Sequence, residues 1–205
     1  MLNKPISVMK EKQFIVFDSE KKSKIPFKLY IKEKTIQKRI NEIGKVISKD
    51  FKNNKLPPIL IGVLNGCLFF MSDLMKATTI EMEMDFIKVS SYRGTSSTGN
   101  VRLIKDISAQ IVNRDIIIVE DIIDTGLTIN FLRKHFNSNS PASISIITLL
   151  YKKEISEMEI EPNYYGFIIP NKFVIGYGLD YKQKYRRLRD IYVIDEEYKK
   201  DNNIK

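Results

Sequence analysis

Short apolar runs alternate with longer amphipathic segments along most of the chain. Short runs rich in β-branched residues are typical of strands that are buried on both faces of a sheet. Segments that repeat apolar residues every three or four positions predict amphipathic helices. The predicted strands are residues 57–64, 83–89, 115–119, 143–150, 173–178 and 191–194, and the predicted helices are residues 35–51, 66–75 and 128–137.

The order of these elements predicts an α/β protein with a mostly parallel sheet, because strands that alternate with helices are joined by parallel crossovers. Two short strand patterns, residues 14–17 and 27–31, precede the first helix. We expect them to pack with the C-terminal segment as a small separate lobe. Ligands of open α/β sheets bind beyond the carboxyl ends of the strands. Chemistry is therefore expected in the loops that follow Leu64, Val89, Glu120 and Leu150.

The length and composition agree with a folded globular protein of about one domain. The chain has 205 residues, of which 43% are hydrophobic, enough to build a sizeable core. Its apolar runs are too short to span a bilayer, and the N-terminus does not resemble a secretory signal. The single cysteine, Cys67, cannot form an internal disulfide. We therefore expect a cytoplasmic protein with no membrane partner.

The net charge of +9 is compatible with a nucleic acid or with a small polyanion as ligand. The lysines are scattered, with neither a basic stripe on one helix nor zinc-finger spacing, so a nucleic-acid partner is not expected. The single histidine, His135, excludes a histidine-based triad or a multi-histidine metal site. It is expected to be structural or exposed.

The strongest candidate for chemistry is the stretch from residue 119 to 128, where an apolar strand pattern runs into acids and then a polar turn. Glu120 and Asp121 can accept hydrogen bonds from a vicinal diol or bind Mg²⁺. The turn that follows can present backbone N–H groups and hydroxyls to a phosphate at a helix N-terminus. An ordinary helix start, capped by Asp124 or Thr125, is the alternative. The two acids directly before the turn favour the ligand site.

Residues 116–128, IIIVEDIIDTGLT, resemble the signature of type I phosphoribosyltransferases that binds phosphoribosyl pyrophosphate (PRPP). The motif VEDIIDTG is similar to that of the hypoxanthine-guanine branch. Similarity to the family extends from about residue 57 to 195. The resemblance implies a single domain over residues 1–205. Its core would span about 35–170, with a hood formed by residues 1–34 and about 171–205.

The resemblance also implies roles for the residues of this stretch. Thr125, Gly126 and Thr128 would hold the 5-phosphate, with Asp124 and Leu127 contributing backbone. Glu120 and Asp121 would hold the ribose hydroxyls and Mg²⁺. Asp124 would take the proton from purine N7 as general base.

Further motifs follow in the family's order. Residues 64–67 resemble the pyrophosphate loop, which often contains a non-proline cis peptide, and Asn65 and Gly66 are its candidate residues. Many members carry lysine where Asn65 stands, so this chain has one positive charge fewer there. From the residues alone, a plain strand-to-helix turn and a glycine that lets the backbone approach a ligand are equally favoured. Arg186 would contact pyrophosphate.

Residues 90–100 are polar and glycine-flanked, which is typical either of a linker or of a functional lid. They resemble the family's flexible catalytic loop. That resemblance implies that Ser91 and Tyr92 close over PRPP and exclude water.

The purine would be held by residues from two further segments. Lys152, with Lys153 as the alternative, would donate to the 6-oxo group of the base, although a solvated lysine at a strand end is the simpler reading. The segment KFVIGYGLDY resembles the family's purine-binding strand. It implies that Phe173 stacks on the base. Without the resemblance, Phe173 would be interpreted as an aromatic residue of the core. The resemblance also implies that Val174 reads the base edge, that Ile122 forms an apolar floor, and that Asp180 helps to hold a second Mg²⁺.

The implied reaction transfers phosphoribose from PRPP to N9 of hypoxanthine or guanine with Mg²⁺, giving a nucleoside monophosphate and pyrophosphate in purine salvage. Two alternatives remain: the same fold acting on xanthine or another base, and a PRPP-fold regulator that binds RNA. A P-loop kinase is disfavoured because the chain lacks its glycine-lysine motif. The family commonly forms dimers or tetramers, so a homo-oligomer is expected.

Overall fold

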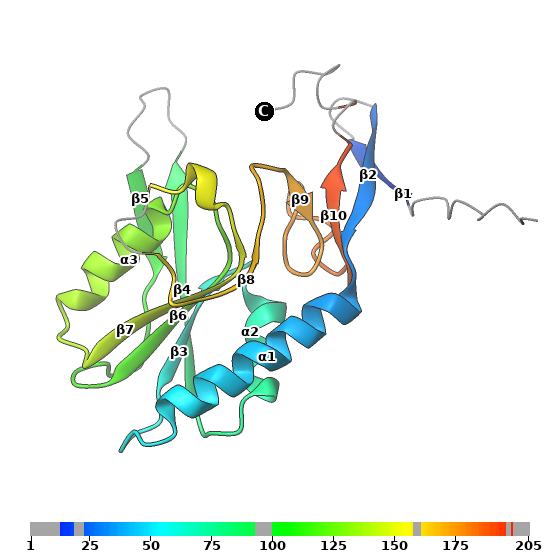
Figure 1. Ribbon diagram of the computed structural model, residues 1–205. Coiled ribbons are helices and arrows are strands. Elements are labelled where there is room, and N and C mark those ends of the chain that lie inside the picture. The colour runs from blue at the N-terminus through cyan, green and yellow to red at the C-terminus, as the bar shows by residue number, and fades with distance from the viewer. Residues whose placement is uncertain (1–12, 19–22, 93–99, 158–160, 196–197, 199–205) are drawn as a thin grey trace, which may run out of the picture.

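The protein has a mixed α/β architecture, seen in a computed structural model that describes residues 13–18, 23–92, 100–157, 161–195 and 198 (Figure 1). Three α-helices and two sheets make up the described part of the chain. The helices are α1 (Glu33–Phe51), α2 (Leu68–Ala77) and α3 (Leu127–Asn137), and a 3-10 turn, η1, covers Lys153–Ile155. The strands are β1 (Gln13–Asp18), β2 (Ser23–Ile31), β3 (Ile59–Leu64), β4 (Glu83–Tyr92), β5 (Asn100–Lys105), β6 (Asp115–Ile123), β7 (Ser143–Tyr151), β8 (Tyr164–Ile168), β9 (Val174–Ile175) and β10 (Ile191–Ile194).

The large sheet has six strands in the order β5-β4-β3-β6-β7-β8. The pairs from β4 to β8 are parallel, and only the edge pair of β4 and β5 is antiparallel. The expectation of a mostly parallel sheet is therefore confirmed. The carboxyl ends of β3, β6 and β7 lie next to one another, which gathers the loops that follow them at one edge.

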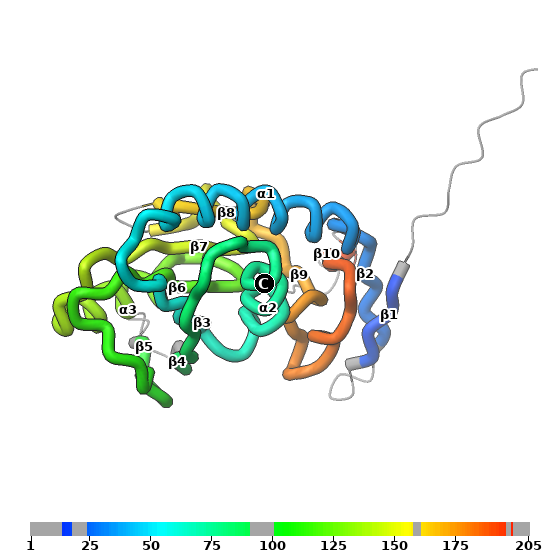
Figure 2. The backbone as a smooth tube through the Cα atoms, turned by 90° about the horizontal axis from the view of Figure 1, so that it is seen from below, coloured from blue at the N-terminus to red at the C-terminus, as the bar shows by residue number. Residues whose placement is uncertain are grey.

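Helices cover both faces of this sheet, which explains why its central strands are apolar throughout. Alternate residues of β6 point to opposite faces. Ile117 packs in a core shared with α1 and α2, whereas Ile116 and Ile118 pack in a core shared with α3. All three are fully buried. Figure 2 shows α1 running across one face of the sheet with α3 on the opposite side.

Helix α1 forms where the apolar period predicts it. Ile36, Ile40, Ile43 and Ile47 recur at helical spacing, and each is at most 4% exposed. Their stripe faces the sheet, and the lysines between them face solvent. None of the described helices combines the length and the apolar character that a membrane crossing needs.

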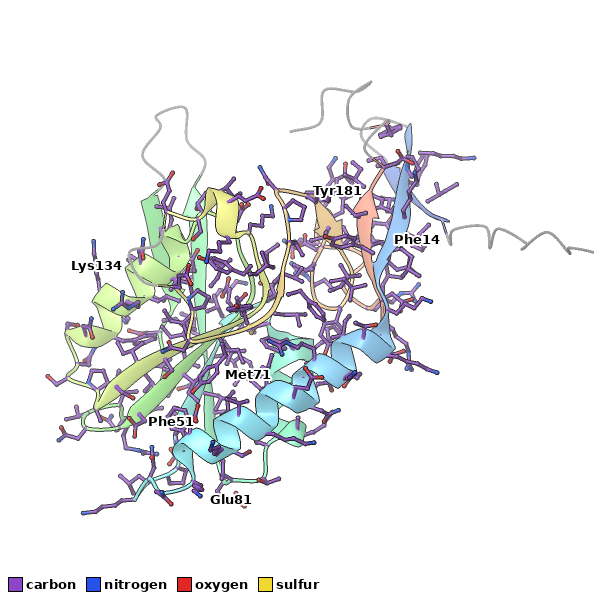
Figure 3. The ribbon with its side chains drawn as sticks, in the orientation of Figure 1. Phe14, Phe51, Met71, Glu81, Lys134 and Tyr181 are labelled. Carbon is purple, nitrogen blue, oxygen red and sulfur yellow. The ribbon has the colours of Figure 1, made fainter. Side chains whose placement is uncertain are left out.

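The small lobe is a four-stranded antiparallel sheet in the order β1-β2-β10-β9. It joins N-terminal and C-terminal segments, as expected from the sequence, and stands to one side of the large sheet (Figure 1). Its own core contains Val16, Phe27 and Ile194. Figure 3 shows Phe14 and Tyr181 in this lobe and Met71 beside the large sheet.

Several predicted boundaries were wrong. The strand predicted at 173–178 is reduced to Val174–Ile175, because Gly176, Tyr177 and Gly178 all have positive φ and turn the chain away. Strand β6 continues past residue 119, so Glu120 and Asp121 lie within its last residues. Strands β5 and β8 were not predicted. The polar stretch 90–100 was expected to be a loop throughout, but its first residues belong to β4 and its last begins β5.

Candidate functional site

Two partly buried carboxylates lie near the carboxyl end of β6. The Oε2 atom of Glu120 is buried, and no group in the described part of the chain hydrogen-bonds to it. Burial, reinforced by the neighbouring charge of Asp121, raises the pKa of Glu120 well above its usual value. Burial also raises the pKa of Asp121 to about 6, although the backbone N–H of Ile122 donates to its Oδ1 at 3.0 Å. A buried carboxylate oxygen without a partner, such as Oε2 of Glu120, is typical of a site prepared for a cation or a hydroxyl ligand.

The Asp121→Asn variant is expected to melt at a higher temperature than the unmodified protein at pH 7.5 without ligands. An aspartate that ionises near pH 4 when unfolded and near pH 6 when folded destabilises the fold as the pH rises through that window. Asparagine keeps the acceptor for Ile122 and removes the charge. Thermal unfolding at a series of pH values should show the advantage shrinking between about pH 6 and pH 4. If the variant is less stable than the unmodified protein at pH 7.5, the ionised Asp121 carboxylate does not destabilise the fold.

The turn after β6 ends on Gly126, which has a φ of 86° and is the N-cap of α3. The helix start has no side-chain capping hydrogen bond, so neither Asp124 nor Thr125 has the capping role that was the alternative. The first-turn N–H groups of Leu127 and Thr128 therefore stay available to an anion, and the helix dipole favours negative charge there. The turn is braced from outside by Glu157, whose N–H donates to the Thr125 carbonyl at 2.8 Å.

Three loops pack together around Gly66. The Leu64–Asn65 peptide bond is cis, as the resemblance implied. A Cβ atom on Gly66 would lie 1.6 Å from Oδ2 of Asp121, so only glycine fits against the β6 acids. A Cβ on Gly178, whose φ is +100°, would lie 2.1 Å from the Gly66 carbonyl oxygen. The close packing explains why glycine stands at residues 66 and 178, and it places the predicted pyrophosphate loop against the β6 acids. Cys67 is fully buried there, and burial first, then the nearby acids, raises the pKa of its thiol.

Arg186 and Asp180 form an ion pair beside this junction. Their Nη2 and Oδ1 atoms are 2.8 Å apart, and each side chain is about a quarter exposed. Nη1 of Arg186 also donates to the Gly178 carbonyl at 2.7 Å. The guanidinium therefore holds the loop that packs on Gly66, with an edge still open to solvent. That position suits contact with a polyanion.

A cavity of about 210 Å³ lies between β6, the end of β7 and the segment leading into β9. The lining residues are Asp121, Ile122, Asp124, Lys152, Lys172, Phe173, Val174, Leu179 and Asp180. The cavity therefore brings together the four residues that the resemblance implied for the base, and it adds Asp180. Its lining combines apolar side chains with side chains of both charges.

Lys152 is not a solvated lysine at a strand end. It is only 7% exposed, and its ammonium lies 3.3 Å from Oδ2 of Asp124. A backbone hydrogen bond from its N–H to the Ile123 carbonyl, 3.0 Å long, fixes it beside the β6 turn. Lys153 points elsewhere, to Glu161 at 2.7 Å on the exposed surface. The geometry thus favours the first of the two candidate lysines.

Phe173 is half-buried, with its ring packed against two aromatic neighbours. It lies 6.3 Å from the Phe27 ring in a tilted arrangement and meets the Tyr181 ring edge-on at 6.0 Å. Such contacts fix the plane of the ring. A residue that is only partly in the core while lining the cavity is able to stack on a flat ligand.

Ser91 and Tyr92 lie at the end of β4 rather than within a loop, because Ser91 pairs with Val101 and Tyr92 with Asn100. Residues 93–99, the rest of the candidate catalytic loop, lie outside the described residues. His135 lies far along α3 and contacts Asp106 at 3.0 Å, in keeping with a structural role.

A network that the sequence did not reveal ties the small lobe to α2. The Tyr177 hydroxyl donates to Oδ2 of Asp73 at 2.6 Å, and Nε2 of Gln37 donates to the same oxygen at 2.6 Å. Burial acts to raise the pKa of Asp73, but these hydrogen bonds lower it below its usual value. The ionised carboxylate thus joins α1, α2 and the loop that packs on Gly66. No local pattern marks residues 104 positions apart as partners.

The Tyr177→Phe variant is expected to lose roughly 1.5 kcal/mol of stability, the size of a hydrogen bond to a charged acceptor. Urea unfolding measures the loss. Tyr192→Phe is the matched control, because its hydroxyl contacts Asp190 at a longer 3.4 Å. Equal losses in both variants would show that the Asp73 contact has no special weight.

The acids at the end of β6 also suit a divalent cation. Within the described ranges no three histidine, cysteine or acidic side chains converge as a ready metal cage. Mg²⁺ does not need one, because it usually binds through one or two carboxylates and completes its shell with waters and substrate oxygens. The unpartnered Oε2 of Glu120 beside Asp121 meets that requirement.

A mostly parallel sheet that gathers an uncapped helix start and a pocket with a buried ammonium at its strand ends is typical of α/β proteins that bind phosphorylated ligands. Comparison with known families identifies which family of α/β proteins this is. Residues 32–182 match the phosphoribosyl transferase domain, and the chain belongs to that family.

Curated relatives are bacterial purine phosphoribosyltransferases. The chain is 44% identical over 168 residues to the hypoxanthine-guanine phosphoribosyltransferase of Bacillus subtilis. The aligned region covers 82% of this chain and 92% of the relative. It is 45% identical over 162 residues to the hypoxanthine phosphoribosyltransferase of Buchnera aphidicola, covering 78% and 92%. The bifunctional protein TilS/HprT of Listeria monocytogenes is 41% identical over 171 residues, which are 83% of this chain but only 26% of that longer protein.

Solved structures agree with these relatives. A hypoxanthine-guanine phosphoribosyltransferase from Bacillus anthracis, with a HEPES molecule in its active site, matches with a TM-score of 0.77 and 38% identity, covering 82% of this chain and 98% of that one. The hypoxanthine phosphoribosyltransferase of Trypanosoma cruzi, a mutant in a ternary substrates complex, matches with a TM-score of 0.77 and 41% identity. That match covers 83% of this chain and 96% of that one.

Proposed function

We propose that this chain transfers the 5-phosphoribosyl group of PRPP to N9 of hypoxanthine or guanine, giving the nucleoside monophosphate and pyrophosphate in purine salvage. The observation that carries the proposal is the 3.3 Å contact between the buried Lys152 ammonium and Asp124 in one cavity. It sets a donor for an oxo group beside a carboxylate that can accept a proton. The sugar-phosphate turn starts at the same aspartate.

The sugar phosphate binds along the end of β6 and the start of α3. The N–H groups of Leu127 and Thr128, with the hydroxyls of Thr125 and Thr128, hold the 5-phosphate around Gly126. Glu120 and Asp121 accept hydrogen bonds from the ribose hydroxyls. The uncapped start of α3 and the unpartnered Glu120 oxygen support this orientation.

The pyrophosphate group lies toward Asn65, Gly66 and Arg186. The close packing of Gly66 on Asp121 and of Gly178 on Gly66 supports a shared binding surface, with the Arg186 guanidinium at its edge. Glu120 and Asp121 would hold one Mg²⁺ and Asp180 a second, and such a metal would supply positive charge against the leaving pyrophosphate. The oxygen-rich donor set supports this metal.

The base stacks on Phe173 over the floor formed by Ile122, with the Val174 backbone at its edge. Lys152 donates to the 6-oxo group, which selects against a 6-amino purine, itself a donor. Asp124 takes the proton from N7 while the bond to N9 forms. Ser91 and Tyr92 close over PRPP and exclude water from the reactive sugar.

A panel of bases tests this function. The full chain is incubated with PRPP, Mg²⁺ and hypoxanthine, guanine, xanthine or adenine in turn, and nucleotide and pyrophosphate are quantified. We expect both products in equal amounts with hypoxanthine or guanine, little with adenine, and none after chelation of the metal. Turnover only with xanthine would reassign the base. Salt-dependent RNA binding with no nucleotide from any base would replace the enzyme by a regulator. Homo-oligomeric assembly and a cytoplasmic location remain predictions.

A further inference from the structure

We propose that Asn171 is a positioning residue for base recognition: it holds the Lys152 ammonium so that one N–H is aimed at the oxo group of the purine. Asn171 does not line the cavity, so it acts through Lys152 and not by touching the base. The inference rests on the function proposed above and assigns a residue on which the selectivity of that site depends.

The hydrogen-bonding capacity of Lys152 is the first argument. An ammonium has three N–H donors and no acceptor. The Lys152 Nζ atom lies 3.2 Å from Oδ1 of Asn171 and 3.3 Å from Oδ2 of Asp124. One donor is used by the Asn171 oxygen and the ammonium is ion-paired with Asp124, so at least one N–H remains for a ligand in the cavity that Lys152 lines.

Lys152 is more buried than either of its anchors. It is 7% exposed although Asn171 is an exposed residue and the Asp124 side chain is 45% exposed, so water reaches the ammonium poorly and replaces a missing acceptor only in part. The side chain is long and has many rotamers, and ordering it costs conformational entropy. With Asp124 as its only partner, the ammonium would be free to rotate about that contact and its remaining N–H groups would have no fixed direction.

The backbone around Asn171 explains how it reaches Lys152. Residue 169 is tied to the end of β7, since the Ile169 N–H donates to the Tyr151 carbonyl at 2.9 Å. A tight turn follows, in which the Lys172 N–H donates to the Pro170 carbonyl at 2.7 Å. Asn171 lies inside this turn, two residues before Phe173. The contact with Lys152 therefore aligns the residue proposed to read the oxo group with the ring proposed to stack on the base.

The chemistry of the second anchor also matters. An amide oxygen accepts a hydrogen bond without adding a full negative charge. Asp124 remains the only carboxylate in contact with the Lys152 ammonium among the described residues. The positive charge of Lys152 is thus shared with one anion and with the ligand oxygen, which favours an electron-rich oxo group.

The test compares two ligands that differ in the oxo group at position 6 and in the hydrogen that this group places on N1; measuring each before and after the substitution isolates the effect of Asn171. Hypoxanthine carries the oxo group, and unsubstituted purine lacks it. Each is measured as a competitive inhibitor of guanine turnover by the full chain, before and after Asn171→Ala. We expect the variant to bind hypoxanthine about tenfold more weakly, the effect of one hydrogen bond to a charged group. We expect purine binding and the KM for PRPP to change less than twofold.

Two further variants serve as controls. Asn171→Asp keeps an acceptor oxygen but adds a second carboxylate beside the ammonium, so it should bind hypoxanthine more tightly than Asn171→Ala and less tightly than the unmodified protein. Glu161→Gln alters the partner of the neighbouring Lys153, 2.7 Å away on the exposed surface, and should change neither inhibition constant.

The outcomes separate this inference from the function on which it rests. If the unmodified chain forms no nucleotide from any 6-oxopurine, the proposed function fails. If it forms nucleotide, and Asn171→Ala weakens hypoxanthine and purine equally or neither of them, the function stands and the positioning role is overturned. An equal loss for both ligands would mean that Asn171 only shapes the turn.

Discussion

The Asp124→Asn variant is expected to bind PRPP as tightly as the unmodified protein and to lose turnover by a factor of about 10²–10⁴, the usual contribution of a general base. Asparagine keeps the shape of the side chain and an oxygen for the Lys152 ammonium, which lies 3.3 Å from Oδ2 of Asp124. It cannot take a proton from the base. Asp124 contributes only backbone to the proposed phosphate site, so PRPP binding should survive.

Turnover is measured by nucleotide formation at saturating substrates, and PRPP binding by calorimetry. Asp106→Asn is the matched control. It neutralises a carboxylate that contacts His135, outside the candidate site, at 3.0 Å. Normal turnover in the Asp124 variant would contradict its role as the base. A loss of PRPP binding would show that the charge of Asp124 contributes to binding of the sugar phosphate.

The Gly66→Ala variant is expected to lose about 10²-fold in kcat/KM for PRPP, the cost of displacing a reacting group by about 1 Å. The added methyl group would lie 1.6 Å from Oδ2 of Asp121, so either the pyrophosphate loop or the β6 acid must move. Both are parts of the proposed PRPP site, and Gly178 packs on the other side of the same loop.

The kinetic comparison uses initial rates over a range of PRPP concentrations. Leu68→Ala alters the first residue of α2, directly after the same loop, where the residue is 49% exposed, without adding an atom near Asp121. It should retain near-normal kcat/KM. If the Gly66→Ala variant keeps both its kcat/KM for PRPP and its melting temperature, the loop and the β6 acid can move apart without affecting PRPP, and the prediction is wrong.

The core of the fold was predictable because its strands are buried on both faces. A continuous apolar run such as the start of β6 has few alternatives to a central parallel strand. The edges were harder. Strand β5 carries Arg102 and Lys105 among its apolar residues, and β8 has Gly166 in its middle. An edge strand needs only one buried face, so its pattern is weak.

The strand predicted at 173–178 failed for a backbone reason. Its residues are apolar and aromatic, but Gly176 has a φ of 95° and Tyr177 a φ of 49°. A tyrosine in the left-handed region gives no local signal. It is held there by contacts from distant segments, including the Tyr177–Asp73 hydrogen bond.

The candidate site was predictable where one continuous stretch carries it. The acids of β6 and the turn before α3 are adjacent in sequence, so their chemistry can be inferred from the order of residues. The contact of Asn171 with Lys152 joins residues 19 positions apart, and only the pairing of β7 with β8 brings them together. Long-range hydrogen bonds of this kind have no sequence period.

The most direct test of the account is a crystal structure of the full chain grown with Mg²⁺ and a non-hydrolysable analogue of PRPP. We expect the 5-phosphate at the turn around Gly126 and the ribose hydroxyls at Glu120 and Asp121. An analogue bound elsewhere, or a β6 turn that stays closed to it at saturating concentration, would contradict the assignment.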